Sequence, residues 1–337
     1  MQPKVSVVIP SFNRWPLVAE TVENMLGQSL APHEVIVVDD GSSDGSAGLL
    51  RERFGGRIRV IEQANQGPGA ARNAGLKVAT GEFIHLMDSD DLVSRNKLET
   101  QTDALIRSGG DIVYGPWAPV YFKGRNVSLK DHVLQQRPLP DDRDGITWYM
   151  TDWAIVFQTM LVRRSLIERA GFYRTDMWSS DDTEYFMRLL TASPKLAFDE
   201  RALTLYRLDD HGKVTGSGRP STRKMVDWAK TVLANVEHAK RIGHPAWRHP
   251  QSRLRVQNAL EDLLGNCPDE RELVEQLTAI RDAIPASAGF PMKRRLGQLR
   301  AGLRRRLYGS RWSRPYQAGP FQAFQKQLVE ELGFVVA

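Results

Sequence analysis

The chain has 337 residues, of which 41% are hydrophobic and 26% charged, and its formal net charge is +6. This composition is typical of a folded globular protein and excludes a fibrous repeat or an intrinsically disordered chain. No run of about 18 or more apolar residues occurs, and the apolar run near the N-terminus is too short for a signal peptide, so we expect neither a membrane-spanning helix nor a leader. The single cysteine, Cys267, excludes an internal disulfide and favours a reducing, cytoplasmic setting.

The first 115 residues alternate between strand and helix patterns. Short, β-branched apolar runs predict buried strands, and apolar residues between them recur at helical spacing. This rhythm predicts right-handed crossovers, so we expect an α/β fold with a Rossmann-like, mostly parallel sheet flanked by helices. The predicted strands span 5–10, 34–39, 57–62, 82–87 and 111–114, and the predicted helices span 17–26, 47–54, 69–78 and 96–108.

The alternation stops after residue 115. Prolines and mixed charges between 116 and 150 predict loops and a short edge hairpin. Farther on, 155–162 and 197–207 have extended patterns, and 183–190 has a helical one. From about Met225 onward, apolar residues recur at helical spacing, which predicts a C-terminal helical extension.

The change of pattern also predicts how the chain divides into domains. We expect one domain over 1–218, made of a first half at about 1–115 and a second half at about 116–218. A helical region over 219–337 follows it.

Polar and acidic turns follow three of the predicted strands. Strand 5–10 leads into Ser11-Phe12-Asn13, strand 34–39 into Asp39-Asp40-Gly41, and strand 82–87 into Asp88-Ser89-Asp90-Asp91. Each stretch by itself is also common turn chemistry. Because the carboxyl ends of parallel strands meet at one edge of an open sheet, where ligands bind, the three turns together indicate a binding site.

The stretch 88–91 is the most unusual, because it puts three carboxylates within four residues. Like charges this close repel and raise one another's pKa values. A hard divalent cation relieves the repulsion, and carboxylate oxygens suit Mg²⁺ or Mn²⁺, which often share their ligands with substrate phosphates. The alternative is a solvated acidic helix cap. No histidine or cysteine cluster has the spacing of a zinc site.

The stretch Gly67-Pro68-Gly69-Ala70-Ala71-Arg72 begins like a dinucleotide-binding fingerprint. Arginine stands where the third glycine belongs, and the stretch follows the third strand rather than the first, so we expect no Rossmann cofactor site. Arg72 near the start of a helix could contact an anion or a nucleobase, or it could lie on the surface as an ordinary arginine.

A second acidic cluster, Trp178-Ser179-Ser180-Asp181-Asp182, directly precedes the predicted helix 183–190. A serine could cap this helix, with the acids in its first turn. A carboxylate at a helix start, beside a flat aromatic, could instead deprotonate a bound hydroxyl. Trp178 could stack on a sugar, whereas we expect Trp153 to lie in the core.

Taken together, these segments resemble the family 2 glycosyltransferases, which have the GT-A fold. The resemblance covers roughly two thirds of the chain, and its segments follow the family's order and spacing. It implies transfer of a sugar from a nucleotide-diphosphate sugar, UDP-linked in our expectation, to an acceptor hydroxyl with inversion at the anomeric carbon. The matching segments are 5–13, 37–46, 65–75 and 81–91, together with the pair Asp181-Asp182.

The resemblance also implies roles for individual residues in donor binding. Asp40, with Asp39, would hold a uracil-type base, Arg72 would contact the base or the diphosphate, and Asp88 would face the ribose. Asp90 would bind the Mn²⁺ or Mg²⁺ ion that bridges the two phosphates. The implied nucleotide-binding residues are Pro10, Ser11, Asn13, Asp39, Asp40, Arg72 and Asp88.

On the acceptor side, Asp182 falls where the family places its catalytic base. The family usually has Glu-Asp here, so Asp181 is one methylene shorter than the usual acceptor-side residue, and Trp178 is the aromatic beside it. His211 and Lys213 follow in a glycine-rich loop that would either close over the diphosphate or merely connect. The Gln-x-x-Arg-Trp motif of processive synthases is absent, which implies addition of one sugar or a few.

Residues 293–314 hold nine Lys or Arg and no acid, with leucines at helical spacing between them. The pattern resembles an interfacial helix that docks on an anionic membrane surface, which would place a cytoplasmic protein at the inner face of the membrane. A solvated basic helix, or one packed on the rest of the chain, is the alternative. No recognised nucleic-acid module accompanies the charge, so we expect no nucleic-acid partner.

Two other functions fit parts of the pattern. A sugar-phosphate nucleotidyltransferase needs a glycine-rich basic loop after its first strand, and Ser11-Phe12-Asn13-Arg14 lacks the glycines. A sugar-nucleotide-binding protein without transfer activity would not need Asp88, Asp90 and Asp182 together. We therefore expect a metal-dependent glycosyltransferase of cell-surface polysaccharide, glycolipid or glycoconjugate synthesis, with a carbohydrate, lipid-linked or protein hydroxyl as acceptor.

Overall fold

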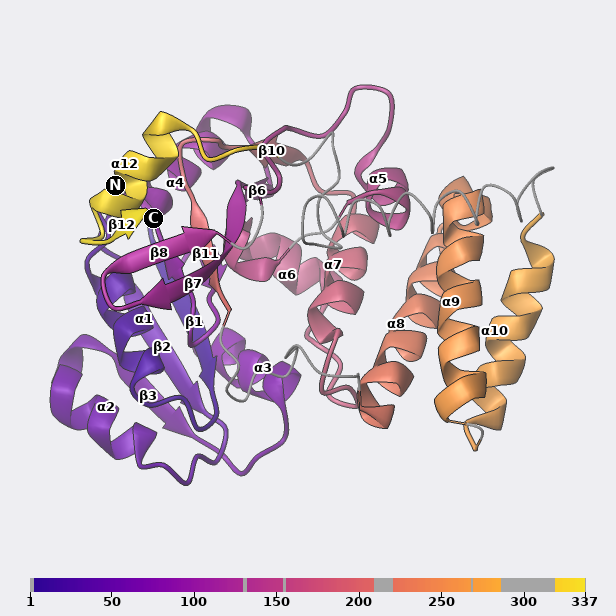
Figure 1. Ribbon diagram of the computed structural model, residues 1–337, viewed down its shortest axis with the longest axis horizontal. Coiled ribbons are helices and arrows are strands. Elements are labelled where there is room, and N and C mark those ends of the chain that lie inside the picture. The colour runs from indigo at the N-terminus through magenta and orange to yellow at the C-terminus, as the bar shows by residue number, and fades with distance from the viewer. Residues whose placement is uncertain are drawn as a thin grey trace.

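The computed structural model describes residues 3–129, 132–153, 156–208, 221–267, 269–285 and 319–336. Two β-sheets and their helices form one side of the molecule (Figure 1). Three helices lie next to one another on the other side: α8 (Thr222–Arg241), α9 (Pro250–Asn266) and α10 (Arg271–Ala283).

The main sheet contains β1 (Val5–Ser11), β2 (Glu34–Asp39), β3 (Arg59–Glu62), β4 (Phe83–Leu86), β6 (Ile112–Tyr114), β9 (Met160–Arg163) and β10 (Leu196–Phe198). Their order across the sheet is β10-β6-β9-β4-β1-β2-β3. β9 runs antiparallel to both of its neighbours, and the other pairs are parallel. The predicted mostly parallel sheet is confirmed.

Both faces of the main sheet are covered by helices, which explains why its strands have continuous apolar sequences. Along β1, Val5, Val7 and Ile9 contribute to one core and Val8 to the opposite one. The first core includes α1 (Leu17–Leu26), α2 (Ser46–Phe54) and α4 (Lys97–Ser108), and the second includes α3 (Pro68–Val78), α6 (Arg164–Ala170) and α7 (Asp181–Thr191). All four helices predicted before residue 110 are present, whereas α6 was not predicted.

A second sheet is built from segments that lie far apart in the sequence. It contains β5 (Leu92–Val93), β7 (Trp117–Lys123), β8 (Asn126–Leu129), β11 (Thr204–Arg207) and β12 (Val335–Val336). Their order is β12-β8-β7-β11-β5, and β7 with β8 forms the hairpin predicted within 116–150. The last strand, β12, pairs in parallel with β8.

Two expectations for the middle of the chain were wrong. The segment 116–150 also contains a helix, α5 (Gly145–Thr151), which begins where the Asp144 carboxylate accepts a hydrogen bond from the Thr147 N–H (2.9 Å). The strand predicted over 155–162 starts only at Met160, because Phe157–Thr159 forms a 3-10 turn. That turn matters below, since it carries Gln158.

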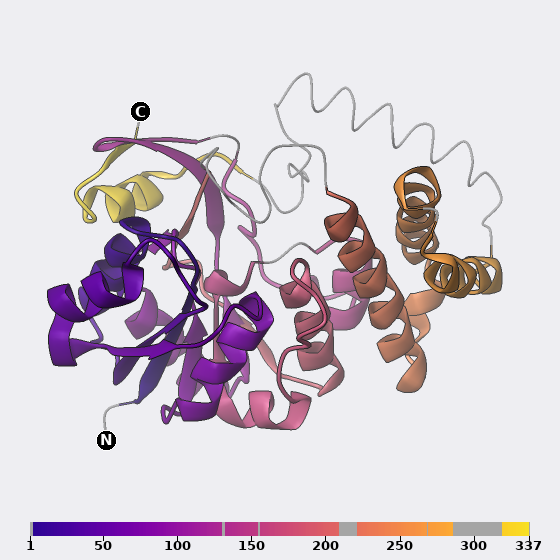
Figure 2. The ribbon, with the colours of Figure 1, turned by 90° about the horizontal axis from the view of Figure 1, so that it is seen from below.

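Helices α8 to α10 are continuous with the core of the main sheet. Val232 and Val236 of α8 and Leu260 of α9 belong to the same buried cluster as Val8 of β1. Figure 2, turned from Figure 1, shows α8 beside α7. The chain then returns to the second sheet, where α12 (Ala323–Glu330) buries Leu328 and Val329.

Several expectations fall outside the described residues. These are the domain boundary near residue 218, the loop residues His211 and Lys213, and the basic segment 293–314. Among the helices that are described, none is both long enough and apolar enough to cross a membrane.

Gly75 of α3 lies where the helix packs on β1. A Cβ here would overlap Cγ1 of Val8 and lie 3.3 Å from Cγ2 of Val38, both on buried strands. We expect Gly75→Ala to lower the free energy of unfolding by about 1–3 kcal/mol, measured by urea unfolding, because overpacking forces the strands to shift.

Gly48→Ala in α2 is the matched control. Nothing lies within 4 Å of its Cβ position, so alanine should stabilise the protein by up to about 1 kcal/mol through helix propensity alone. Equal effects of the two substitutions would contradict the close helix–strand approach at Gly75.

Candidate active site

The carboxyl ends of three parallel strands share one edge of the main sheet. β1 pairs with β2 on one side and β4 on the other, and Ser11 lies opposite Asp39 in the register. The Met87 N–H donates to the Val8 carbonyl (3.0 Å), which keeps the chain beside β1 just before Asp88. The convergence of the three polar turns, predicted from the sequence, is thus present.

Hydrogen bonds join the turns that follow β1 and β2. The Asn13 N–H donates to Ser42 Oγ (2.8 Å), and Asn13 Oδ1 accepts from the Ser43 N–H (2.8 Å). Ser42 Oγ also donates to Asp39 Oδ1. Asn13 has a left-handed φ of 50°, which asparagine tolerates better than most residues. Asn13 and Asp39 therefore fix the shape of the expected nucleoside pocket.

Pro10 and Ser11 lie at the end of β1, opposite Val38 and Asp39. Ser11 is buried, and its Oγ has no hydrogen-bond partner within the described part of the chain. A buried hydroxyl without a partner is costly, and a ligand that hydrogen-bonds to it would remove that cost. This placement fits the expected lining of the nucleoside pocket.

Asp40 holds the loop that leads from β3 into α3. Its Oδ1 accepts from Gln63 Nε2 (2.8 Å) and the Gln66 N–H (2.9 Å), and its Oδ2 accepts from the Gly67 N–H (2.8 Å). A carboxylate has about four acceptor positions, so three are occupied and about one remains for a ligand. Asp40 thus holds the 63–67 loop and keeps about one acceptor position for a ligand.

Arg72, in α3, joins the two acidic clusters. Its NH2 donates to Asp88 Oδ1 (2.9 Å) and its NH1 to Asp181 Oδ2 (2.8 Å). Burial alone lowers the pKa of a guanidinium, but the carboxylates of Asp181 and Asp88 outweigh it and raise the pKa of Arg72. The surface alternative for Arg72 is excluded, since the residue is buried between the two clusters.

The acidic stretch after β4 is held by residues from elsewhere in the chain. Asp91 is fully buried; its Oδ1 accepts from the Arg207 N–H (2.7 Å) and its Oδ2 from Gln158 Nε2. Gln158 Nε2 also donates to Asp88 Oδ2 (3.2 Å), and Arg207 Nε donates to the Asp90 carbonyl (2.6 Å). Gln158 and Arg207 were not predicted, because nothing in their local sequence indicates these long-range contacts.

Few carboxylates lie where they could bind a metal ion. Asp90 Oδ2 lies 3.7 Å from Arg14 Nε, while Asp88 has its side chain 35% exposed. No group of three or more His, Cys, Asp or Glu residues in the described ranges is arranged to hold a metal. Mg²⁺ and Mn²⁺ are commonly held by one or two carboxylates plus substrate phosphates, and Asp88 with Asp90 fits that type of site.

Asp182 lies in the first turn of α7, beside Asp181. Its Oδ1 accepts from the Thr183 N–H (2.7 Å) and from Thr183 Oγ1 (3.3 Å). Burial, together with the Asp181 carboxylate, raises the pKa of Asp182 to about 6, while Arg72 acts in the opposite direction. A carboxylate that titrates near neutral pH is suited to take a proton from a hydroxyl.

A serine cap, one of the two interpretations of this acidic cluster, is absent. Ser180, at the N-cap position, has a left-handed φ of 60° and makes no side-chain hydrogen bond to the helix. The Trp178 ring lies under the Arg223 guanidinium, 4.3 Å away, and 3.4 Å from where a Cβ of Gly67 would lie. Trp153 stacks on Trp148 in the core, as expected.

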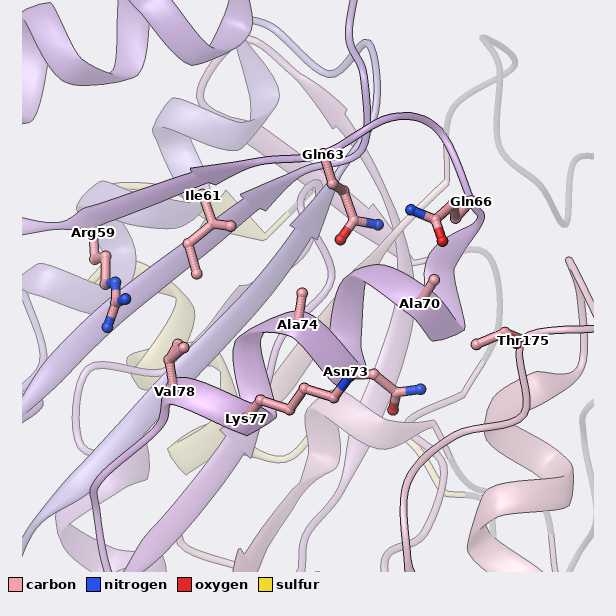
Figure 3. A pocket seen from close by; sticks show the side chains of 10 residues that line it. All are labelled: Arg59, Ile61, Gln63, Gln66, Ala70, Asn73, Ala74, Lys77, Val78 and Thr175. Carbon is pink, nitrogen blue, oxygen red and sulfur yellow. The ribbon is translucent and has the colours of Figure 1, made fainter.

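A hollow of about 470 Å³ lies beside this edge, between β3 and α3. Figure 3 shows Gln63 and Gln66 near one end of it, the first of which donates to Asp40. None of the predicted site residues lines it. Its lining residues are Arg59, Ile61, Gln63, Gln66, Ala70, Asn73, Ala74, Lys77, Val78 and Thr175.

Replacement of Arg72 by methionine should destabilise the protein, because it leaves the buried Asp181 carboxylate without its cation. We expect a loss of about 3 kcal/mol in the free energy of unfolding at pH 7. The pKa of Asp181 in the folded protein is already raised by burial and would rise further, so the loss should shrink as the pH falls toward about 4 and the group is protonated.

Arg53→Met is the matched control, since Arg53 forms an exposed ion pair with Glu23. We expect the free energy of unfolding of this variant to fall by at most about 1 kcal/mol, because both partners of the pair are exposed to solvent. Denaturant unfolding at several pH values measures both, and a pH-independent loss for Arg72→Met would contradict the role of Asp181.

A family model and two relatives match part of this chain. Residues 6–171 match the family Glycosyl transferase family 2. The glycosyltransferase GlyG of Streptococcus pneumoniae is 30% identical over 221 residues, which cover 61% of this chain and 71% of GlyG. EpsJ of Bacillus subtilis, an uncharacterized glycosyltransferase, is 29% identical over 220 residues, so the chain spans only 62% of its length.

Solved structures are similar over more of the chain but at lower identity. TarS of S. aureus in complex with UDP-GlcNAc has a TM-score of 0.55 at 16% identity, covering 82% of this chain and 88% of TarS 1–349. The mannosyltransferase PcManGT from Pyrobaculum calidifontis, in complex with GDP-Man and Mn²⁺, has a TM-score of 0.52 at 19% identity, covering 98% and 85%. These likenesses show the fold, which is GT-A. The chain belongs to glycosyl transferase family 2 and is a glycosyltransferase that uses a nucleotide-sugar donor.

Proposed function

We propose that the chain is an inverting, metal-dependent glycosyltransferase that moves a sugar from a UDP-linked donor to an acceptor hydroxyl. The observation that carries the proposal is the pair of contacts from Arg72 to Asp88 and Asp181. These contacts join the loop after β4, in the first half of the domain expected at about 1–115, to helix α7, in the second half at about 116–218. Helix α7 carries Asp182. These contacts support a site at which the donor and the proposed base act together.

Asp182 is the proposed base. Its raised pKa, about 6, lets it be ionised at neutral pH and still hold a proton after the transfer. Asp182 takes the proton of the acceptor hydroxyl, whose oxygen attacks the anomeric carbon. The bond from that carbon to the diphosphate oxygen breaks on the opposite face, so the configuration inverts and the nucleoside diphosphate leaves with the electron pair.

Asp90, together with Asp88, would hold Mg²⁺ or Mn²⁺, which extends the expectation from the sequence that Asp90 binds the ion and Asp88 faces the ribose. When bound, such an ion neutralises charge on the diphosphate leaving group. Asp91 is not a ligand in this proposal, since it is fully buried and both of its oxygens accept hydrogen bonds from the protein, whereas the Asp88 side chain is 35% exposed. The complex of PcManGT with GDP-Man and Mn²⁺ supports a divalent ion in proteins of this fold.

The hydrogen bonds that Asp40 already accepts support uracil as the base of the donor. About one of its acceptor positions remains, because three donors occupy the others. Uracil offers a single ring N–H to an acceptor, whereas guanine offers two neighbouring N–H groups. The complex of TarS with UDP-GlcNAc is consistent with this choice. Thermal-shift screening with UDP-, GDP- and dTDP-sugars in the presence of Mn²⁺ tests it.

Asp182→Asn should keep UDP binding and lose transfer, because the amide cannot accept the proton. We expect a drop in rate of about 10²–10⁴-fold, measured as UDP release from the donor sugar. The wild-type rate should fall as the pH drops below about 6, where Asp182 becomes protonated.

Asp176→Asn provides the control for Asp182→Asn, since Asp176 precedes the same helix but forms an exposed ion pair with Arg174. Its rate and pH profile should match those of the wild type. Transfer at near wild-type rate by Asp182→Asn would show that Asp182 is not the base.

Asp90→Asn should weaken metal-dependent donor binding. We expect UDP affinity measured by calorimetry with Mn²⁺ to fall by at least about tenfold, while the affinity measured with EDTA changes little, because a neutral amide is a poorer ligand for a hard cation. An equal loss with and without Mn²⁺ would instead assign Asp90 to direct nucleotide contact.

A further inference from the structure

Helix α8 lies outside the segment matched to the family, and it contacts the turn that precedes Asp182. Asp227 of α8 is only 3% exposed. Its Oδ2 accepts hydrogen bonds from the Trp178 N–H (3.0 Å), the Ser179 N–H (3.0 Å) and Ser179 Oγ (3.2 Å). One carboxylate oxygen thus binds two consecutive backbone amides and a hydroxyl of the same turn.

Two further residues of α8 bind the same region. Thr231 Oγ1 donates to the Ser180 carbonyl (3.2 Å), and His238 Nε2 lies 2.9 Å from Glu184 Oε1. Residue 231 lies about one helical turn after residue 227, and residue 238 lies about three turns after it. The three side chains therefore share one face of α8. This face follows α7 from the turn before it to Glu184 in its first turn.

Helix α7 needs such support because it lacks a cap of its own. Ser180 makes no side-chain hydrogen bond to the helix and has a left-handed backbone, which disfavours most residues other than glycine. Asp182 is only two residues beyond it. The position of its carboxylate therefore depends on how firmly the turn at Trp178 and Ser179 is held.

We propose that Asp227 is a positioning residue for the transfer reaction, which it serves by fixing the turn that places the Asp182 carboxylate against the acceptor hydroxyl. The inference rests on the proposed function in taking Asp182 as the base. It gives helix α8 a part in catalysis through the turn that it holds, while Asp182 of α7 remains the base. A displacement of about 1 Å between base and hydroxyl can cost about 10²-fold in rate.

The test uses the full chain with Asp227→Ala and Asp227→Asn. The asparagine variant keeps one carbonyl oxygen, which can accept about two of the three hydrogen bonds, so it should rescue part of the activity. Glu237→Ala, on the same helix but with its side chain 46% exposed, is the matched control. Thr231→Val, which removes the bond to the Ser180 carbonyl, carries the test if Asp227→Ala does not fold.

Three readouts separate positioning from general stability. The first is kcat for UDP release from UDP-glucose, UDP-galactose or UDP-N-acetylglucosamine, whichever the wild type turns over fastest with Mn²⁺. The second is the affinity for UDP with Mn²⁺. The third is hydrogen–deuterium exchange of the Trp178 and Ser179 amides, with 63–67, the loop held by Asp40, as the internal reference.

We expect Asp227→Ala to lower kcat by about 10–100-fold, with UDP affinity within about twofold of wild type and faster exchange confined to Trp178 and Ser179. Asp227→Asn should lie in between, and Glu237→Ala should match wild type. Faster exchange with unchanged kcat would overturn the proposal, and so would a parallel loss of kcat, UDP affinity and thermal stability.

Failure of this inference is distinguishable from failure of the proposed function. If Asp182→Asn remains active, the base assignment fails, whatever Asp227→Ala does. If Asp182→Asn is inactive and Asp227→Ala retains full kcat, the base assignment stands and only the positioning role of Asp227 is wrong.

Discussion

The guanidinium of Arg72 holds together two carboxylates that come from different parts of the chain, Asp88 after β4 and Asp181 at the start of α7. Three acids, Asp88, Asp181 and Asp182, all lie close enough to Arg72 to interact with its charge. A buried cation with two partners fixes distance and direction, since its planar group donates in set directions. The rest of the site is arranged around that geometry.

The glycine-rich stretch before Arg72 allows the close approach that these contacts of Arg72 require. It fails as a dinucleotide fingerprint, yet a Cβ at Gly69 would lie 2.6 Å from the Arg174 carbonyl. The start of α3 can therefore approach the loop before α7 only without a side chain at this position. Close approach of the two elements is what brings Arg72 within reach of Asp181.

The repulsion expected within the acidic stretch 88–91 is relieved largely by the protein itself. Arg72 binds Asp88, Arg14 lies near Asp90, and Gln158 with the Arg207 backbone binds Asp91. Asp91 thereby becomes an anchor of the loop, whereas the Asp88 side chain is 35% exposed and Asp90 lies beside Arg14. Three acids that are close neighbours in the sequence thus have different surroundings. Asp91 differs from the other two because Arg207 of β11 and Gln158 of the turn before β9 bind it.

Local sequence determined the order of the first strands and helices, the edge where the polar turns meet and the helix predicted over 183–190, which in the structure begins at Asp181. These features depend on apolar periodicity and on residues close in the chain, which a sequence displays directly. The missed helix α5, the antiparallel β9 and the pairing of β12 with β8 depend on contacts across long loops, which no local pattern encodes. The roles of Gln158, Arg207 and Asp227 have the same origin, since each acts through partners that folding brings near. The sequence therefore determined which residue types were present for the chemistry, and the tertiary structure decided which of them meet, because the buried charges of Asp91 and Asp181 had to find partners wherever the packed chain supplied them.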